Sequence, residues 1–415
     1  MFNHPKAKHI YCGVDVHRKT HTACFMNCFF EKLGEITFPN TPSSFNILLE
    51  ESKKYCPQGM TVIYGLEDSG MAGRSLAVFL IDMKCSVKTV NSKYTNAERK
   101  ALPIYEKTDS FDALCCARVL LSRLESLPNA NPIDNYWTLK MLVGTRNSIV
   151  KSNVALKNQI QAYIMHHYPS YKKFFSVFDC PTALEFWENY PSPSHLKGIS
   201  VDELAKFLRL PSDDFFGTKK AQFILETVKA DGDTSTEHQQ TRDFIISESV
   251  KEMKHKAKEI SKIEREMKKI MQGMSYHLES MIGIELVSAC SFVAEIGDIN
   301  RFSSSAQLAK YSGICPITYA SGDKEKKFKN RQGNRRLYHQ FHSLAARNIN
   351  PGRNKNKPVN DIFYAYYKKK LSEGKTEHQA LIAVMRRLVN IVYGLMKNGS
   401  KYIHPNSSAR RLKMI

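Results

Sequence analysis

Residues 10–16 read Ile-Tyr-Cys-Gly-Val-Asp-Val, an apolar run rich in β-forming residues that contains a single acid, Asp15. A second such run at 22–28 and a third around 35–38 follow, with turn-forming residues between them. This spacing predicts a meander of three strands. An acid between two strand valines requires a partner, because an isolated buried charge is costly. The run therefore predicts the first strand of a sheet and a functional role for Asp15.

Strand and helix patterns alternate after the meander. The pattern predicts helices at 43–51, 71–81 and 109–124, and strands at 61–66 and 85–90, before a proline-containing segment at 127–134. Such alternation favours βαβ units. We expect a first domain of the α/β class over residues 1–125.

A helical, charged region follows over residues 126–276, with a proline-punctuated middle at 169–211. Its last helix has apolar residues at three-and-four spacing, namely Val250, Met253, Ala257, Ile260, Met267, Met271 and Met274. A narrow apolar seam between Lys and Glu faces predicts a coiled coil. An earlier helix at 142–164 has a weaker stripe, so the two helices pair with each other or with another subunit. A helix packed within its own domain is the alternative.

Residues 277–415 predict a third, mainly helical domain. Helices are expected at 282–296, directly after 302–311, at 359–371 and at 377–396, with a Gly- and Lys-rich loop at 313–334. The fold class is thus α/β for the first domain and all-α for the remainder.

The charge of the chain favours a polyanionic partner. The chain has 61 Lys and Arg residues and 40 Asp and Glu residues, which gives a formal net charge of +21. Such a field attracts nucleic acid, although a solvated basic surface is the alternative reading. The ten cysteines have no CxxC pair and no zinc spacing, which favours reduced, buried thiols. No stretch has the apolar length of a membrane span, so we expect a soluble cytoplasmic protein that uses no membrane.

Four acids form a candidate metal site. Asp15 and Glu67 each come at the end of a predicted strand, and Asp109 and Asp112 lie three apart at a helix start, on one face. Converging carboxylates repel each other unless cations bind, and hard divalent ions such as Mg²⁺, with Mn²⁺ as a substitute, prefer oxygen ligands. Two alternatives remain open: Asp109 is an N-cap with Asp112 in the first turn, or Asp68 replaces Glu67 as the ligand.

The motifs GVDVH, YGLEDSG and KTDSFDA, in this order, resemble the DEDD-type transposases of the insertion-sequence-110 family. The resemblance continues in MIGIELVSACSFVAEIGDINRF, residues 281–302, and in the segment 308–345. It therefore spans nearly the whole chain. It implies a RuvC-like ribonuclease H fold for residues 1–125 and a transposase domain for residues 277–415.

The resemblance also implies a chemistry. Ser321 matches the serine nucleophile of the family, whereas without the resemblance it reads as a turn residue beside Gly322. Cationic residues around it would bind the scissile phosphate and its flanks: Lys324, Lys326, Lys327, Lys329, Arg331, Arg335 and Arg336.

The implied function is a recombinase that cuts and rejoins DNA for insertion-sequence mobility, through a covalent serine–DNA intermediate. The resemblance further implies guidance by a structured bridge RNA and a homodimer or homotetramer joined through the coiled coil. Guide pairing would suit a +21 chain that lacks a recognisable base-reading motif. One alternative is a RuvC-like structure-selective nuclease that uses the same acids with water as its nucleophile. Another is a non-catalytic RNA-binding or architectural protein.

Overall fold

The protein, examined as a computed structural model, is described over residues 4–67, 71–102, 108–232, 237–321, 324–328, 330, 333–350 and 358–404. It divides into two compact units. The first comprises Met1–Thr138 and Gly297–Ser303, and the second comprises Leu139–Ile296 and Ser304–Ile415.

The first unit contains a five-stranded mixed sheet. Its strands are β1 (His9–Val16), β2 (Thr20–Met26), β3 (Lys32–Pro39), β4 (Thr61–Leu66) and β5 (Ser86–Thr89), in the order β3-β2-β1-β4-β5. The first three strands pair antiparallel, which confirms the predicted meander. β4 is parallel to β1, and β5 is parallel to β4, as βαβ connections require.

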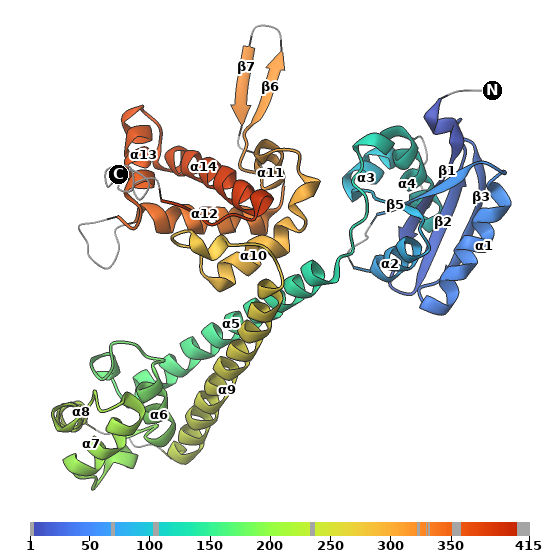
Figure 1. The fold of residues 1–415 in the computed structure, drawn as a ribbon. Helices are drawn as coiled ribbons and strands as arrows, with labels where there is room; N and C mark the ends of the chain where they lie inside the picture. The colour runs from blue at the N-terminus through green and yellow to red at the C-terminus, as the bar shows by residue number, and fades with distance from the viewer. Residues whose placement is uncertain are drawn as a thin grey trace. The chain divides into compact units, whose positions relative to one another are not determined.

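Helices cover both faces of this sheet (Figure 1). Alternate β1 side chains point to opposite faces, so Cys12 and Val14 pack in one core with α1 (Phe45–Tyr55) and α2 (Arg74–Asp82). Tyr11 packs on the other face against α4 (Asp109–Arg123). The α/β prediction for this part of the chain is confirmed. A helix that was not predicted, α3 (Ser92–Ala101), packs against α4.

Gly13 sets how closely α4 approaches the sheet. A Cβ atom added at Gly13 would lie 2.1 Å from the backbone N of Ala117 and 2.5 Å from the backbone O of Ala113. Since no real Cβ atom tolerates such contacts, only glycine lets the helix backbone lie directly on β1. This packing brings the first turn of α4 to the end of β1, where Asp15 lies.

The second unit is mostly helical. Its helices are α5 (Asp134–His167), whose first turn belongs to the first unit, α6 (Pro181–Asn189), α7 (Val201–Arg209), α8 (Thr218–Asp231), α9 (Gln239–Gln272), α10 (Leu286–Ile296), α11 (Ser305–Tyr311), α12 (Arg335–Ile349), α13 (Asp361–Ser372) and α14 (Glu377–Asn398).

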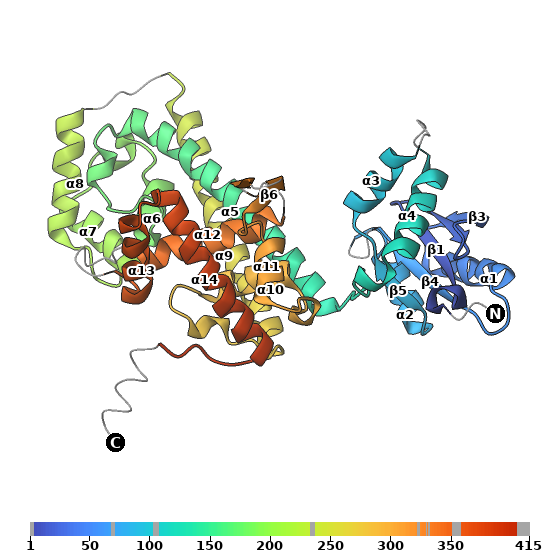
Figure 2. The ribbon, with the colours of Figure 1, turned by 90° about the horizontal axis from the view of Figure 1, so that it is seen from above.

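The long helices α5 and α9 run antiparallel along each other (Figures 1 and 2). Arg146 Nε donates to Glu264 Oε1 at 2.7 Å near one end of the pair, and Val250 and Met253 share a core with Ile160 at the other. At this end, the predicted apolar seam of α9 therefore packs within its own domain, which was the alternative to a coiled coil. Ala257, in the middle of the seam, is exposed.

The predicted loop at 313–334 is wrong. Its residues form an antiparallel hairpin of β6 (Ile317–Ser321) and β7 (Lys324–Phe328), and Asn334 then caps α12. The second strand reads Lys-Glu-Lys-Lys-Phe, which has no alternation of apolar and polar residues, so the sequence pattern does not indicate a strand there. The helix predicted from residue 282 begins at Leu286, because Gly283 takes a positive φ of 88° that ends the preceding turn.

Helix α14 has the length and mean hydropathy, 1.3, of a membrane span, so the prediction that no stretch reaches this length was wrong. Its apolar residues include Val384, Leu388 and Val392, which are fully buried in the second unit. The helix packs against α11, α12 and α13. Its composition is therefore explained by its place in the helical core.

Candidate metal centre

Asp15 is the buried acid of the candidate site. Strand alternation places it on the same face of β1 as Gly13, toward α4, and its side chain is 9% exposed. Burial raises the pKa of Asp15 to about 6; nearby His17 opposes this, while Asp112, Glu67 and Asp109 add to it. His17 Nε2 lies 3.0 Å from Asp15 Oδ2, but this oxygen accepts no hydrogen bond of acceptable geometry from the described residues.

The first turn of α4 carries the two other aspartates. Thr108 is the N-cap, and its Oγ1 accepts a hydrogen bond from Phe111 N at 3.2 Å. The alternative in which Asp109 caps the helix is therefore wrong. Asp109 and Asp112 occupy the first turn, where the helix dipole favours negative charge.

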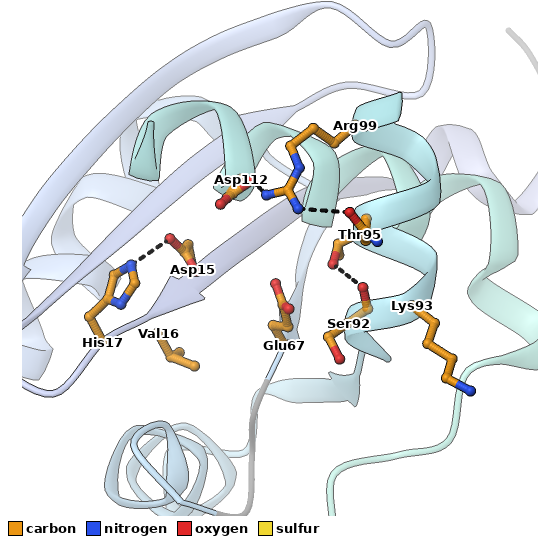
Figure 3. Close-up of a pocket in the computed structure, with 10 residues that line it drawn as sticks. Asp15, Val16, His17, Glu67, Ser92, Lys93, Thr95, Arg99 and Asp112 are labelled. Carbon is orange, nitrogen blue, oxygen red and sulfur yellow. Dashed lines mark hydrogen bonds and ion pairs between the residues drawn. The ribbon is translucent and has the colours of Figure 1, made fainter. Parts of the chain in front are cut away.

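Three of the four acids meet at a cleft of about 520 Å³. Asp15, Glu67 and Asp112 line it and come from the ends of β1 and β4 and the start of α4, and Figure 3 shows their carboxylates around one space. Asp109 is joined to the cleft through His17 Nε2, which is 3.2 Å from Asp109 Oδ1. The competing ligand, Asp68, lies outside the described residues.

The residues fit a divalent cation. One ligand atom each from Asp15, His17 and Asp109 lies within 4.8 Å of the others, close enough to hold one ion. The buried Asp15 Oδ2 accepts no hydrogen bond from the described residues and lies 3.0 Å from one imidazole nitrogen, so a cation bound there would stabilise its charge further. The carboxylate oxygens of this group suit Mg²⁺ or Mn²⁺.

A basic residue that sequence analysis missed faces the acids. Arg99 on α3 donates through Nη1 to Asp112 Oδ1 at 2.6 Å (Figure 3). Its Nη2 donates to Asn96 Oδ1 at 2.8 Å. Lys93 and Asn96, on the same helix, also line the cleft. The cleft thus has an acidic floor and a polar, basic wall.

His17 was also missed, although a signal for it exists. It lies two positions after Asp15, and alternate residues of an extended chain share one face. The second position after a strand-end acid was therefore a candidate ligand from the sequence alone. Arg99 had no such signal, because its place depends on how α3 packs on α4.

The predicted nucleophile and its basic neighbours lie in the second unit. Ser321 is the last residue of β6, with its Cα paired to that of Lys324 on β7, where Lys326 and Lys327 follow. Arg336 lies on the first turn of α12, and its Nη1 is 3.5 Å from Glu295 Oε1. Arg335 on the same turn stacks on Tyr338, and the predicted Lys329 and Arg331 lie outside the described residues.

Two transposase family models match this chain. The DEDD model of the IS110 type, described as transposase, matches residues 12–169 and so includes the four acids. A second model, described as the IS116/IS110/IS902 transposase family, matches residues 275–357 and includes Ser321.

Three insertion-element proteins are also similar to this chain. The chain is 24% identical to an uncharacterized 44.8 kDa protein of insertion element IS116 from Streptomyces clavuligerus, over 94% of this chain and 95% of that protein. It is 22% identical to a 43.6 kDa protein of insertion element IS110 from Streptomyces coelicolor, over 95% of both chains. A 42 kDa protein of IS900 from Mycobacterium paratuberculosis is 24% identical over 72% of this chain and 73% of that protein.

Proposed function

Because this chain belongs to the IS110 family and is a DNA transposase, we propose that it cuts and rejoins DNA with a Mg²⁺-binding DEDD cleft and the serine nucleophile Ser321. The DEDD family itself implies a divalent metal. The observation that carries the proposal is the joining of Asp15, Glu67 and Asp112 at one cleft, with Asp109 linked through His17.

We assign the first domain, residues 1–125, to the RuvC-like ribonuclease H fold. The sheet order β3-β2-β1-β4-β5, with an antiparallel meander followed by two parallel strands, supports this assignment. So do acids at the ends of β1 and β4, the edge where open α/β sheets bind ligands. Residues 126–276 form a helical linker and coiled-coil region, and residues 277–415 form the transposase domain.

Asp15, Glu67, Asp109 and Asp112 would hold Mg²⁺, with Mn²⁺ as a substitute. When bound, the metal supplies positive charge that stabilises the oxygens of a phosphoryl transfer. The protein positions these acids rigidly: the Gly13 contact fixes α4 on β1, and the Thr108 cap fixes its first turn. The basic wall of α3 would orient a DNA strand over them.

Ser321 gives the proposal its strand-exchange chemistry. Its Oγ attacks a backbone phosphorus and loses its proton, while the bond to one DNA oxygen breaks and that oxygen leaves as a hydroxyl. A serine–DNA phosphodiester replaces a DNA phosphodiester, so the step changes the free energy little. A hydroxyl of another DNA end can then attack the same phosphorus, release Ser321 and rejoin the DNA. Lys324, Lys326, Lys327, Lys329, Arg331, Arg335 and Arg336 would bind the phosphates on either side.

The partners follow from the same proposal. Donor and target DNA would bind by backbone contacts, and a structured bridge RNA would select sequences by pairing. A homodimer or homotetramer would bring a cleft and a Ser321 to the same DNA, with the exposed middle of α9, near Ala257, as part of the coiled-coil contact. We place this activity in the cytoplasm, on nucleoid DNA.

The second candidate is a RuvC-like nuclease that uses the same cleft with water as its nucleophile. The cleft itself favours this candidate, because its acids need no residue of the second unit to hold a metal. The nuclease would break phosphodiesters without storing their energy, and it would have no use for Ser321.

A cellular excision assay tests the proposal. We expect Asp15→Ala and Ser321→Ala each to abolish excision and rejoining of a marked insertion element, scored by amplification across the closed junction. Ser372→Ala, an exposed serine on α13, serves as a matched control and should retain wild-type excision. Normal excision by the Ser321 variant would exclude the serine mechanism, and normal excision by the Asp15 variant would exclude the metal cleft.

A further inference from the structure

Arg99 forms an ion pair with the carboxylate of Asp112, which is also a proposed ligand of the metal. Its Nη1 lies 2.6 Å from Asp112 Oδ1, and the two side chains are 27% and 15% exposed. Of the two acids in the first turn of α4, Asp112 is the less exposed: its side chain is 15% exposed and that of Asp109 is 59% exposed. A guanidinium in this position neutralises one of the converging acids but adds a positive charge where the cation would bind.

The arrangement makes Arg99 and a divalent cation competitors. Like charges a few ångströms apart in a partly buried cleft repel strongly, so both cannot hold Asp112 at full strength. The Arg99 side chain is partly exposed, so its guanidinium can turn away from Asp112 toward the open cleft. The contact of its Nη2 with Asn96 Oδ1, on the preceding turn of α3, would keep it beside the cleft. Lys93, one turn further back, lines the same wall.

We propose that Arg99 exchanges partners: it pairs with Asp112 in the metal-free cleft and binds a DNA backbone phosphate once metal takes Asp112. This inference rests on the proposed metal site. The planar guanidinium with its five donors binds phosphate as readily as carboxylate, which suits it to such an exchange. A phosphate held by Arg99 would lie beside the acids, where the scissile strand must be positioned.

The exchange predicts that metal and DNA help each other to bind. Metal releases Arg99 for phosphate, and phosphate keeps Arg99 away from Asp112, so each ligand raises the affinity of the other by the same factor. The direct attraction between metal and phosphate adds to this coupling, but a purely structural Arg99 would contribute nothing to it. It would only hold α3 on α4.

The chain offers a matched control for this distinction. Arg118 on α4 pairs with Glu98 on α3 at 2.6 Å, with side chains 28% and 26% exposed. This second ion pair joins the same two helices but lies outside the cleft-lining residues. Losing it should loosen the α3–α4 contact about as much as losing the Arg99 pair.

The test measures Mn²⁺ affinity by electron paramagnetic resonance of the free ion, with and without a short DNA duplex, in the full chain. For Arg99→Gln we expect Mn²⁺ to bind about five- to tenfold more tightly without DNA, because a competing charge is gone. We expect the gain in Mn²⁺ affinity on adding DNA to fall below the wild-type gain, because the share of the coupling that passes through Arg99 is lost. Wild type and Arg118→Gln should keep this gain.

The DNA side of the linkage gives a second readout. Duplex affinity, followed by fluorescence anisotropy, should lose about one unit of salt dependence in Arg99→Gln when Mn²⁺ is present and change little when it is absent. Arg99→Ala repeats both measurements should the glutamine variant fold poorly. Unchanged or weaker Mn²⁺ binding in both Arg99 variants, or an undiminished DNA effect, would overturn the exchange.

Asp15→Asn separates this inference from the proposed function. If it binds Mn²⁺ as tightly as wild type, the metal does not bind in the cleft, and both proposals fall. If it loses Mn²⁺ while the Arg99 variants behave as wild type, the metal site stands and the exchange alone is refuted.

Discussion

At the scale of single residues, the burial of the Asp15 carboxylate at the cleft lowers the stability of the fold. Its carboxylate is nearly buried and one oxygen accepts no hydrogen bond from the described residues, so burial raises its pKa to about 6 from an ordinary 3.8. A residue chosen only for stability would not be a charged acid between Val14 and Val16. The cost is offset if a cation binds there, since the cation stabilises the buried negative charge.

Asp15→Asn should therefore stabilise the metal-free protein at high pH. Because the folded-state pKa of Asp15 is raised, the protonated side chain contributes a stability that is fully present below pH 3.8 and is lost as pH rises through about 6. We expect the variant to gain about 1–3 kcal/mol over wild type above pH 6 in EDTA, and the gain to vanish toward pH 4. Chemical denaturation across this pH range measures it.

Adding Mg²⁺ provides the control for this prediction. Wild type should recover stability with the metal, whereas Asp15→Asn should not. A variant that is less stable than wild type at every pH, or that responds to Mg²⁺ as wild type does, would contradict the account of Asp15.

At the scale of elements, α4 links fold and chemistry. The middle of α4 packs on β1 at Gly13, and the first turn of α4 carries Asp109 and Asp112 at the candidate metal site. The Thr108 side chain satisfies the backbone N–H of Phe111 and so fixes that turn. Capping is thus expected to affect metal binding as well as stability.

Thr108→Ala should cost about 1 kcal/mol of stability and weaken Mn²⁺ binding several-fold, because the first turn frays and its two carboxylates lose their fixed positions. Thr108→Ser keeps a capping hydroxyl and should match wild type in both respects. Thermal unfolding and Mn²⁺ titration measure the two effects. An unaltered Mn²⁺ affinity in the alanine variant would show that the α4 turn does not hold the ion.

Elements with a strong local pattern were predictable from the sequence. β1, β4 and α4 have apolar runs or stripes that fix their type and bring their acids to nearby ends. α3 was not predictable in this way, because Thr95 is its one buried residue and the helix has no apolar stripe. The β6–β7 hairpin was concealed by its lysines, and the ion pair of Arg99 depends on tertiary packing that a sequence pattern does not contain.

At the scale of the whole molecule, the proposed chemistry uses both units. The acids lie in the first unit and Ser321 in the second, and the two family matches cover one group each. A charge of +21 is suited to the phosphate backbone of DNA. The account therefore requires one phosphate to meet the metal cleft and the serine during the same reaction.

The most direct test of this requirement is to look for DNA covalently attached to Ser321. The protein is purified under denaturing conditions from cells that carry the gene with its native flanking DNA, digested with nuclease and protease, and analysed by mass spectrometry. We predict a nucleotide-modified peptide containing Ser321 in wild type and none in Ser321→Ala or Asp15→Ala. Cleaved DNA without any such adduct, or an adduct that persists in Ser321→Ala, would contradict the account.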